Sequence, residues 1–153
     1  MKKLIFLDVD GVLNSRAFML AALDCGVTDM TGAGALDPQA VRTLEIIHLE
    51  HRPDWVLSSV WRFDRTPEQM TALLGTHGFT GTIISATGDD GPHRGGEIQQ
   101  WLVDHKAIGR PFVILDDDRD MGDLLPRLVW TTFSRGLEPV HVEEVRRLFA
   151  GAP

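Results

Sequence analysis

The chain has 153 residues, of which 43% are hydrophobic and 24% charged, a composition typical of one globular domain with a sizeable core. Its formal net charge of -7 argues against avid, nonspecific binding to nucleic acid, because phosphate contacts need clustered Lys and Arg. No apolar run reaches the roughly 18 residues that a membrane helix needs, so we expect no membrane partner.

The first predicted element is a buried strand that ends in acidic residues. Residues 4–7 form an unbroken apolar run, and Asp8 and Asp10 follow it, with Gly11 to let the backbone turn. Ligands bind at the carboxyl ends of strands in an open α/β sheet, so both carboxylates would lie at one mouth. Like charges there are costly unless a cation binds or one acid keeps its proton. The two acids alone fit a solvated acidic loop equally well.

Residues 15–37 are the least regular part of the chain. A short helix over 17–23 would be capped by Ser15 and would end at Gly26, before the glycine-rich stretch 31–34. We expect a flap over the mouth of the first strand, too short to be a separate cap domain. A simple packing excursion is the alternative.

The rest of the sequence alternates predicted helices with predicted strands. Asp37 and Thr66 each precede a proline, a pattern typical of a helix start. Apolar spacing predicts two further helices, at about 98–105 and from about 140. Apolar runs predict strands at 55–57, 82–85, 112–115 and 128–131, and 89–96 is a polar loop. This order predicts a single three-layer α/β/α Rossmann-like domain over 1–153, with a mostly parallel sheet and a minimal cap or none.

Polar side chains collect where these strands end. The second strand ends at Ser58 and Ser59, and the fourth ends in three consecutive acids, Asp116 to Asp118. Arg94 lies before a helix that opens with two glycines, which favours anion binding. The carboxyl ends of parallel strands meet at one edge, so we expect these groups near the first two acids. A carboxylate nucleophile, a hard cation and a cationic side chain are what phosphoryl transfer requires.

Several residues have a structural interpretation beside the functional one. Arg62, just beyond the two serines, is either a second phosphate contact or part of a packing corner, and Asn14 either lines the pocket or caps a helix. The single cysteine, Cys25, excludes an internal disulfide and suits a reducing, cytoplasmic location, and we expect it to be buried. We also expect three tryptophans in the core: Trp55, Trp101 and Trp130. The six histidines show no zinc-ligand spacing.

The sequence Asp8-Val9-Asp10-Gly11-Val12-Leu13 resembles the first motif of the haloacid dehalogenase-like (HAD) superfamily of phosphatases. Leu57-Ser58, Arg94 and Ile114-Leu115-Asp116-Asp117 follow in the order of its second, third and fourth motifs. The longer pattern, from residue 4 to about residue 137, is similar to the small HAD domains associated with Swiss Army Knife RNA repair proteins.

The resemblance implies a role for each matching residue. Asp8 would be the nucleophile and a ligand of Mg²⁺, and Asp10 would be the general acid/base, with its backbone carbonyl as a second ligand. Ser58 or Ser59 would hydrogen-bond the phosphoryl group, and Arg94 would take the place of the family's basic residue. Two acids of the late cluster, Asp116 and Asp117, would complete the metal site.

The expected function is hydrolysis of a phosphomonoester, either a small molecule, a nucleotide or a nucleic-acid end. The alternative is a non-catalytic phospho-acceptor module like the receiver domains of response regulators. Those domains phosphorylate an acid after a middle strand, whereas here the paired acids come first and the acid cluster comes late. The order of the motifs therefore favours the phosphatase.

Overall fold

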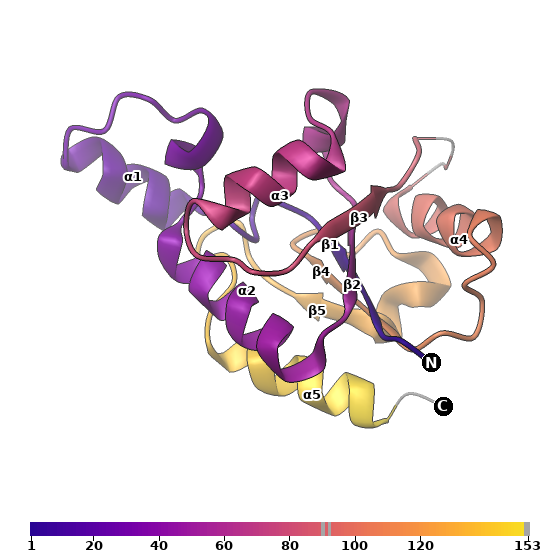
Figure 1. The fold of residues 1–153 in the computed structure, drawn as a ribbon. Helices are drawn as coiled ribbons and strands as arrows, with labels where there is room; N and C mark the ends of the chain where they lie inside the picture. Colours follow the sequence, from indigo (N-terminus) through magenta and orange to yellow (C-terminus); the bar gives the residue numbers. More distant parts are fainter. Residues whose placement is uncertain (90, 92, 152–153) are drawn as a thin grey trace.

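A computed structural model describes residues 1–89, 91 and 93–151 as a parallel sheet with helices on both faces (Figure 1). The strands are β1 (Leu4–Leu7), β2 (Asp54–Leu57), β3 (Ile83–Ala86), β4 (Phe112–Asp116) and β5 (Leu128–Trp130). The α-helices are α1 (Arg16–Asp24), α2 (Pro38–His51), α3 (Pro67–Gly75), α4 (Arg94–Asp104) and α5 (Val140–Ala150). Three short 3₁₀ helices are η1 (Gly32–Ala35), η2 (Val60–Phe63) and η3 (Gly122–Arg127). Across these described residues, no helix has the length and hydrophobicity to cross a bilayer.

The strand order is β3-β2-β1-β4-β5, which places the first strand at the centre of the sheet. Leu7 pairs in parallel register with Leu57 on one side and Leu115 on the other. The ladder continues one residue further, because the Asp8 amide donates to the Leu115 carbonyl and the Ser58 amide to the Leu7 carbonyl. The residues that follow the three central strands are therefore neighbours at one edge of the sheet.

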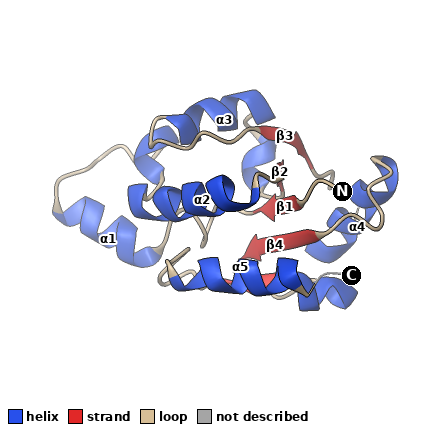
Figure 2. Ribbon diagram, turned by 60° about the horizontal axis from the view of Figure 1, so that its bottom comes forward, coloured by secondary structure: helices blue, strands red, loops and turns tan. Residues whose placement is uncertain are grey.

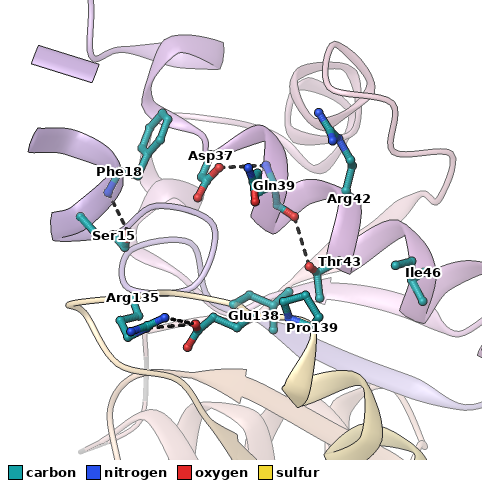
Figure 3. A pocket seen from close by; sticks show the side chains of 12 residues that line it. Ser15, Phe18, Asp37, Gln39, Arg42, Thr43, Ile46, Arg135, Glu138 and Pro139 are labelled. Atoms are coloured by element: carbon teal, nitrogen blue, oxygen red, sulfur yellow. Dashed lines mark hydrogen bonds and ion pairs between the residues drawn. The ribbon is translucent and has the colours of Figure 1, made fainter. Parts of the chain in front are cut away.

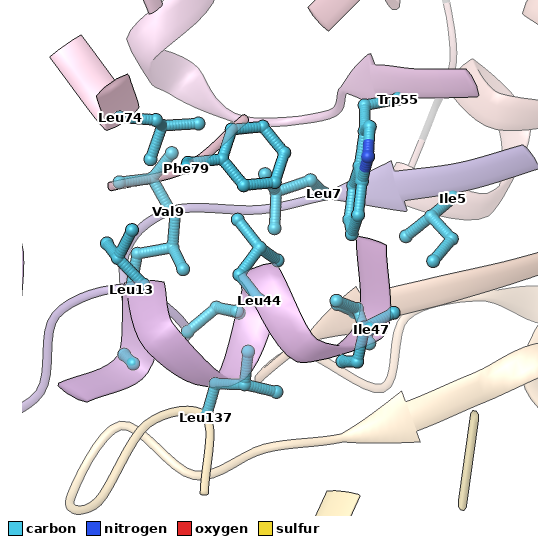
Figure 4. Close-up of a cluster of buried hydrophobic side chains, with 14 of the residues drawn as sticks. Ile5, Leu7, Val9, Leu13, Leu44, Ile47, Trp55, Leu74, Phe79 and Leu137 are labelled. Atoms are coloured by element: carbon cyan, nitrogen blue, oxygen red, sulfur yellow. The ribbon is translucent and has the colours of Figure 1, made fainter. Parts of the chain in front are cut away.

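The two faces of the sheet carry separate apolar clusters. The larger cluster lies between the sheet and the layer of α2, α3 and α5, where Trp55 packs edge-on to Phe79 with 5.4 Å between ring centroids (Figure 4). The smaller one lies under α4 and η3, where Phe6 packs edge-on to Trp101 at 5.3 Å. Figure 2 shows α2 and α5 on one side of the sheet and α4 on the other. The predicted three-layer α/β/α architecture with a parallel sheet is confirmed.

Local sequence signals define most of the helix starts. The Asp37 carboxylate accepts a hydrogen bond from the Gln39 amide, and Thr66 and Gln69 form a reciprocal capping box at the start of α3. Helix α4 begins earlier than predicted, because His93 caps it and Arg94 is its first residue. The predicted loop over 89–96 is therefore shorter, and its residues 90 and 92 lie outside the described residues.

Two burial predictions are wrong. Trp130 is 48% exposed, whereas Trp55 and Trp101 are buried as expected. β5 is an edge strand. Val129 faces the larger cluster, so Trp130 points to the other face, where it is not part of the smaller cluster. Cys25 is also exposed, because it caps the carboxyl end of α1 rather than entering the core.

The segment 15–37 forms α1 and η1, with Ser15 accepting a hydrogen bond from the Phe18 amide as the predicted cap. The Arg16 amide donates to the Phe133 carbonyl, and His77 hydrogen-bonds the Ala33 carbonyl. These bonds fasten the segment to the loop after β5 and to the end of α3. Its action as a flap stays a prediction.

Candidate active site

Three carboxylates converge where β1 and β4 end. Asp8, Asp116 and Asp117 each offer an oxygen, and these oxygens all lie within 4.8 Å of one another. Asp8 is 5% exposed and Asp116 is fully buried, while Asp117 is partly buried. The sequence placed these acids at one sheet edge, and the register of the central strands brings them into contact range.

Burial of these acids disfavours their charged forms. Burial raises the pKa of Asp8 to about 6, although Arg94 and a hydrogen bond from Ser59 act in the opposite direction. Burial also raises the pKa of Asp116, to about 8, and the neighbouring charge of Asp8 adds to the effect. The pKa of Asp117 is raised as well, mainly by burial. All three acids would be better accommodated with a cation among them.

The donor set fits a hard divalent cation. Carboxylate oxygens are the ligands that Mg²⁺ takes in proteins, usually with several water molecules and an oxygen of the substrate. Oδ2 of Asp116 is buried and accepts no hydrogen bond from any described residue, although Nε of Arg94 lies 3.3 Å away as an ion-pair partner. An orphaned buried carboxylate oxygen is the atom that such a cation would satisfy.

Gly11 makes the close approach of these acids possible. Its φ of 76° lies in the left-handed region, and a Cβ at this position would collide with Oδ2 of Asp117. Its carbonyl accepts a hydrogen bond of 2.7 Å from the Thr131 hydroxyl at the end of β5. The turn after β1 is thereby tied to the end of β5, two strands away.

Asp10 is held apart from the three converging carboxylates. Its oxygens each accept from the indole N–H of Trp61 at 3.2 Å, and Oδ1 also accepts from the side-chain amide of Asn14 at 2.8 Å. Asn14 in turn accepts a hydrogen bond from the Gly11 amide at 2.9 Å. Asn14 therefore lines the site, which resolves the alternative left open by the sequence. Trp61 is a site residue that the sequence did not reveal, because nothing local links it to Asp10.

Arg94 connects the acids to a second ion pair. Its Nη2 lies 3.8 Å from Asp8 Oδ1, and its Nη1 lies 3.7 Å from Glu97 Oε2. The other oxygen of Glu97 accepts from Arg62 at 3.1 Å. Nε and Nη1 of Arg62 are buried and contact no hydrogen-bond acceptor within the described part of the chain. Glu97 is a second site residue that sequence reasoning missed, since an acid in the first turn of a helix is ordinary.

The two serines after β2 have different partners. Ser58 follows the strand in line with Asp8, and its buried hydroxyl has no hydrogen-bond partner among the described residues. Ser59 is also buried, and its hydroxyl accepts a weak hydrogen bond of 3.4 Å from the Trp61 amide and caps η2. Ser58 thus has a buried hydroxyl without a partner among the described residues, whereas Ser59 also interacts with Asp8 and lowers the pKa of its carboxyl.

A cavity of about 560 Å³ lies elsewhere, between the starts of α1, α2 and α5 (Figure 3). Several of its polar groups already have partners. Asp37 accepts from the Gln39 amide, Thr43 donates to the Gln39 carbonyl, and Arg135 pairs with Glu138 at 2.8 Å. None of the converging acids lines it.

The chain matches a family model described as "HAD domain in Swiss Army Knife RNA repair proteins" over residues 4–142. No curated protein and no solved structure matches the chain.

Proposed function

Because this chain belongs to the family of HAD domains found in Swiss Army Knife RNA repair proteins, we propose that it is a Mg²⁺-dependent phosphatase that forms an aspartyl-phosphate on Asp8. The HAD domain itself indicates a phosphatase-type hydrolase. The observation that carries the proposal is the convergence of Asp8, Asp116 and Asp117, with the guanidinium of Arg94 beside them.

Asp8 supplies the nucleophilic oxygen, which attacks phosphorus in line with the leaving oxygen. Arg94 and the free hydroxyl of Ser58 hold the equatorial oxygens of the phosphoryl group as their charge redistributes. Bound Mg²⁺ would be held by Asp8, Asp116, Asp117 and the Asp10 carbonyl, and it supplies neutralisation of charge on the phosphoryl oxygens. Arg62 pairs with Glu97 and has two buried nitrogens, Nε and Nη1, without an acceptor among the described residues, and these would contact a second phosphate.

Asp10 carries the proton in both halves of the reaction. It protonates the leaving oxygen when the aspartyl-phosphate forms, and it then takes a proton from the water that hydrolyses this intermediate. Trp61 and Asn14 fix its carboxylate, so that the proton is delivered at one position. Ser59 steadies η2, which carries Trp61.

The substrate that we propose is a phosphomonoester on a nucleotide or a nucleic-acid end. The family description, which names RNA repair proteins, supports this choice over other phosphorylated small molecules. The cytoplasm, which holds such substrates, is the proposed location.

The test is phosphate release from an aryl phosphate and from phosphorylated nucleosides, with Mg²⁺ and with chelator. Asp8→Asn keeps the shape of the side chain but removes the nucleophilic charge, so turnover falls by at least about a thousandfold. Asp120→Asn is the matched control, because it neutralises an exposed acid beyond the cluster and leaves turnover unchanged.

Turnover that survives Asp8→Asn contradicts the mechanism. Mg²⁺-dependent labelling of Asp8 without any turnover would support the receiver-like alternative instead.

A further inference from the structure

An exposed tryptophan stands at the edge of the candidate active site. Trp130 ends β5 and is 48% exposed, yet its indole N–H donates a hydrogen bond of 2.9 Å to the Asp117 carbonyl. Asp117 is one of the three converging acids. The ring is therefore fixed beside the acid cluster, although it adds little to the core.

The guanidinium group of Arg119 lies over the Trp130 ring. The Arg119 guanidinium carbon lies 5.1 Å from the centroid of Trp130, over the ring, and both residues are exposed. Arg119 belongs to the same loop after β4 as Asp117, so one short segment provides an acid of the cluster and the cation over the ring. The guanidinium covers one face of the ring, so a base would stack on the other face of the ring or on the guanidinium plane itself, in either case beside a positive charge.

The position of Trp130 on the sheet matters as much as its exposure. Val129 faces the larger apolar cluster, so Trp130 points to the opposite face, which is the face covered by α4. Arg94, the first residue of α4, lies 3.3 Å from Asp116 and 3.8 Å from Asp8. A phosphoryl group held by Arg94 thus lies on the same face and at the same sheet edge as the Trp130 ring.

A flat ring with an adjacent guanidinium matches the chemistry of a nucleobase followed by a phosphate. Bases stack on aromatic side chains whatever their sequence, and arginine pairs with backbone phosphate. A sugar phosphate without a base has nothing to place on such a surface. The net charge of -7 makes the exposed cation beside the acid cluster more conspicuous, because it opposes the overall sign of the protein.

We propose that Trp130, with Arg119 over it, stacks the nucleobase next to the scissile phosphate and so selects phosphorylated nucleosides over phosphates that lack a base. This inference rests on the phosphatase function proposed above. Trp130 is a specificity-determining residue in this proposal and takes no part in the chemistry at phosphorus.

The test compares KM and kcat of wild type, Trp130→Ala and Trp130→Phe on a nucleoside monophosphate and on ribose 5-phosphate. Trp130→Ala raises KM for the nucleotide by about tenfold and leaves kcat within about twofold, because stacking is lost. It leaves KM and kcat for ribose 5-phosphate unchanged. Trp130→Phe keeps a stacking face and recovers most of the affinity. Ile108→Ala, which removes an exposed apolar side chain before β4, is the control and changes neither substrate.

Two further experiments distinguish a free nucleotide from a nucleic-acid end as the ligand, and allow the stacking role to be tested even if no substrate is turned over. If the natural ligand is a nucleic-acid end, Arg119→Gln weakens binding of a phosphorylated oligonucleotide more than binding of the mononucleotide. If it is a free nucleotide, the substitution weakens binding of both equally. Calorimetry of the Asp8→Asn variant with Mg²⁺ measures nucleotide binding without hydrolysis, with and without Trp130→Ala.

The inference is overturned if Trp130→Ala leaves nucleotide affinity unchanged, or if it lowers the affinity for ribose 5-phosphate as much as the affinity for the nucleotide. If the wild type hydrolyses ribose 5-phosphate and either of these results is found, the stacking role of Trp130 is rejected while the phosphatase function stands. Loss of the phosphatase function would show differently, as no turnover of any phosphomonoester by wild type, and the calorimetric comparison then decides the stacking role.

Discussion

The two ends of the central strands differ in how they accommodate carboxylates. At the amino end, Asp54 lies between Lys2 and Arg110, with Arg110 Nη2 at 2.8 Å. Burial raises the pKa of Asp54, but these two cations outweigh it and lower the pKa overall. At the carboxyl end, Asp8 and Asp116 share one arginine at 3.3 to 3.8 Å, and burial raises both pKa values.

The difference separates an acid that stabilises the fold from acids that do not. Asp54 is ionised and paired as the protein stands, so its charge contributes to stability. The acids at the carboxyl end are crowded, and an oxygen of Asp116 lacks a hydrogen bond from any residue that the structure describes. Residues held in such a costly state are candidates for function.

Asp116→Asn is expected to have the largest effect, with opposite signs for activity and stability. Turnover falls by about a hundredfold or more, because a carboxylate of the proposed metal site is lost. The unfolding free energy in metal-free buffer at pH 8 rises by on the order of 1 kcal/mol, because a buried charge is removed. Phosphate release and denaturant unfolding measure the two effects. A variant that is both inactive and less stable would contradict the contrast.

Metal-free stability is expected to fall as pH rises. The Asp116 carboxyl releases its proton near pH 4 in the unfolded chain but holds it to about pH 8 in the folded protein, and Asp8 holds its proton to about pH 6. The folded state therefore binds more protons between these values, and stability declines as the pH rises from about 4 to about 8.

Thermal unfolding at pH 5 and pH 8, with chelator and with Mg²⁺, measures this decline. Mg²⁺ removes it, because the cation favours the ionised acids. Asp116→Asn flattens the metal-free curve. A metal-free protein that is equally stable at both pH values would show that these acids ionise without cost.

Asn14→Ala tests the support of the proposed general acid. The change removes the amide that donates to Asp10 and leaves the Gly11 amide without its acceptor. We expect kcat to fall by about tenfold, in line with the loss of a hydrogen bond to a charged group. The pH dependence of kcat would also shift, and a purely structural role would lower stability without moving that profile. Trp61→Phe, which removes the other donor to Asp10, is the matching variant.

Asp54→Asn is expected to have the smallest effect, and on stability alone. Lys2 is 61% exposed, so solvent screens its pair, and the loss is about 1 kcal/mol at neutral pH. The folded-state pKa is lowered, so this contribution is present above pH 4 and disappears as pH falls through the lowered pKa. Turnover stays unchanged. A fall in turnover without unfolding would mean that the two ends of the sheet are coupled.

The sequence alone determined the architecture. Short apolar runs alternating with capped, periodic segments imply parallel strands joined by helices, and each of these signals is local. The acids at the ends of β1 and β4 were placed at one edge for the same reason, since the carboxyl ends of parallel strands meet there. Burial was less predictable. Trp130 was expected in the core, because the sequence does not show the strand order that places its strand at the edge of the sheet.

The detailed environment of each side chain was decided by the tertiary structure. Asn14 and Trp61 both donate a hydrogen bond to Asp10. Asn14 is four residues from Asp10 in the sequence, whereas Trp61 follows β2, and only the folded chain brings its indole nitrogen to 3.2 Å from the carboxylate. The pairing of Glu97 with Arg62 and Arg94 likewise joins two crossover connections. Hydrophobic pattern repeats along the chain and can be read from it, whereas these polar contacts depend on strand register and on which residues meet across the sheet edge.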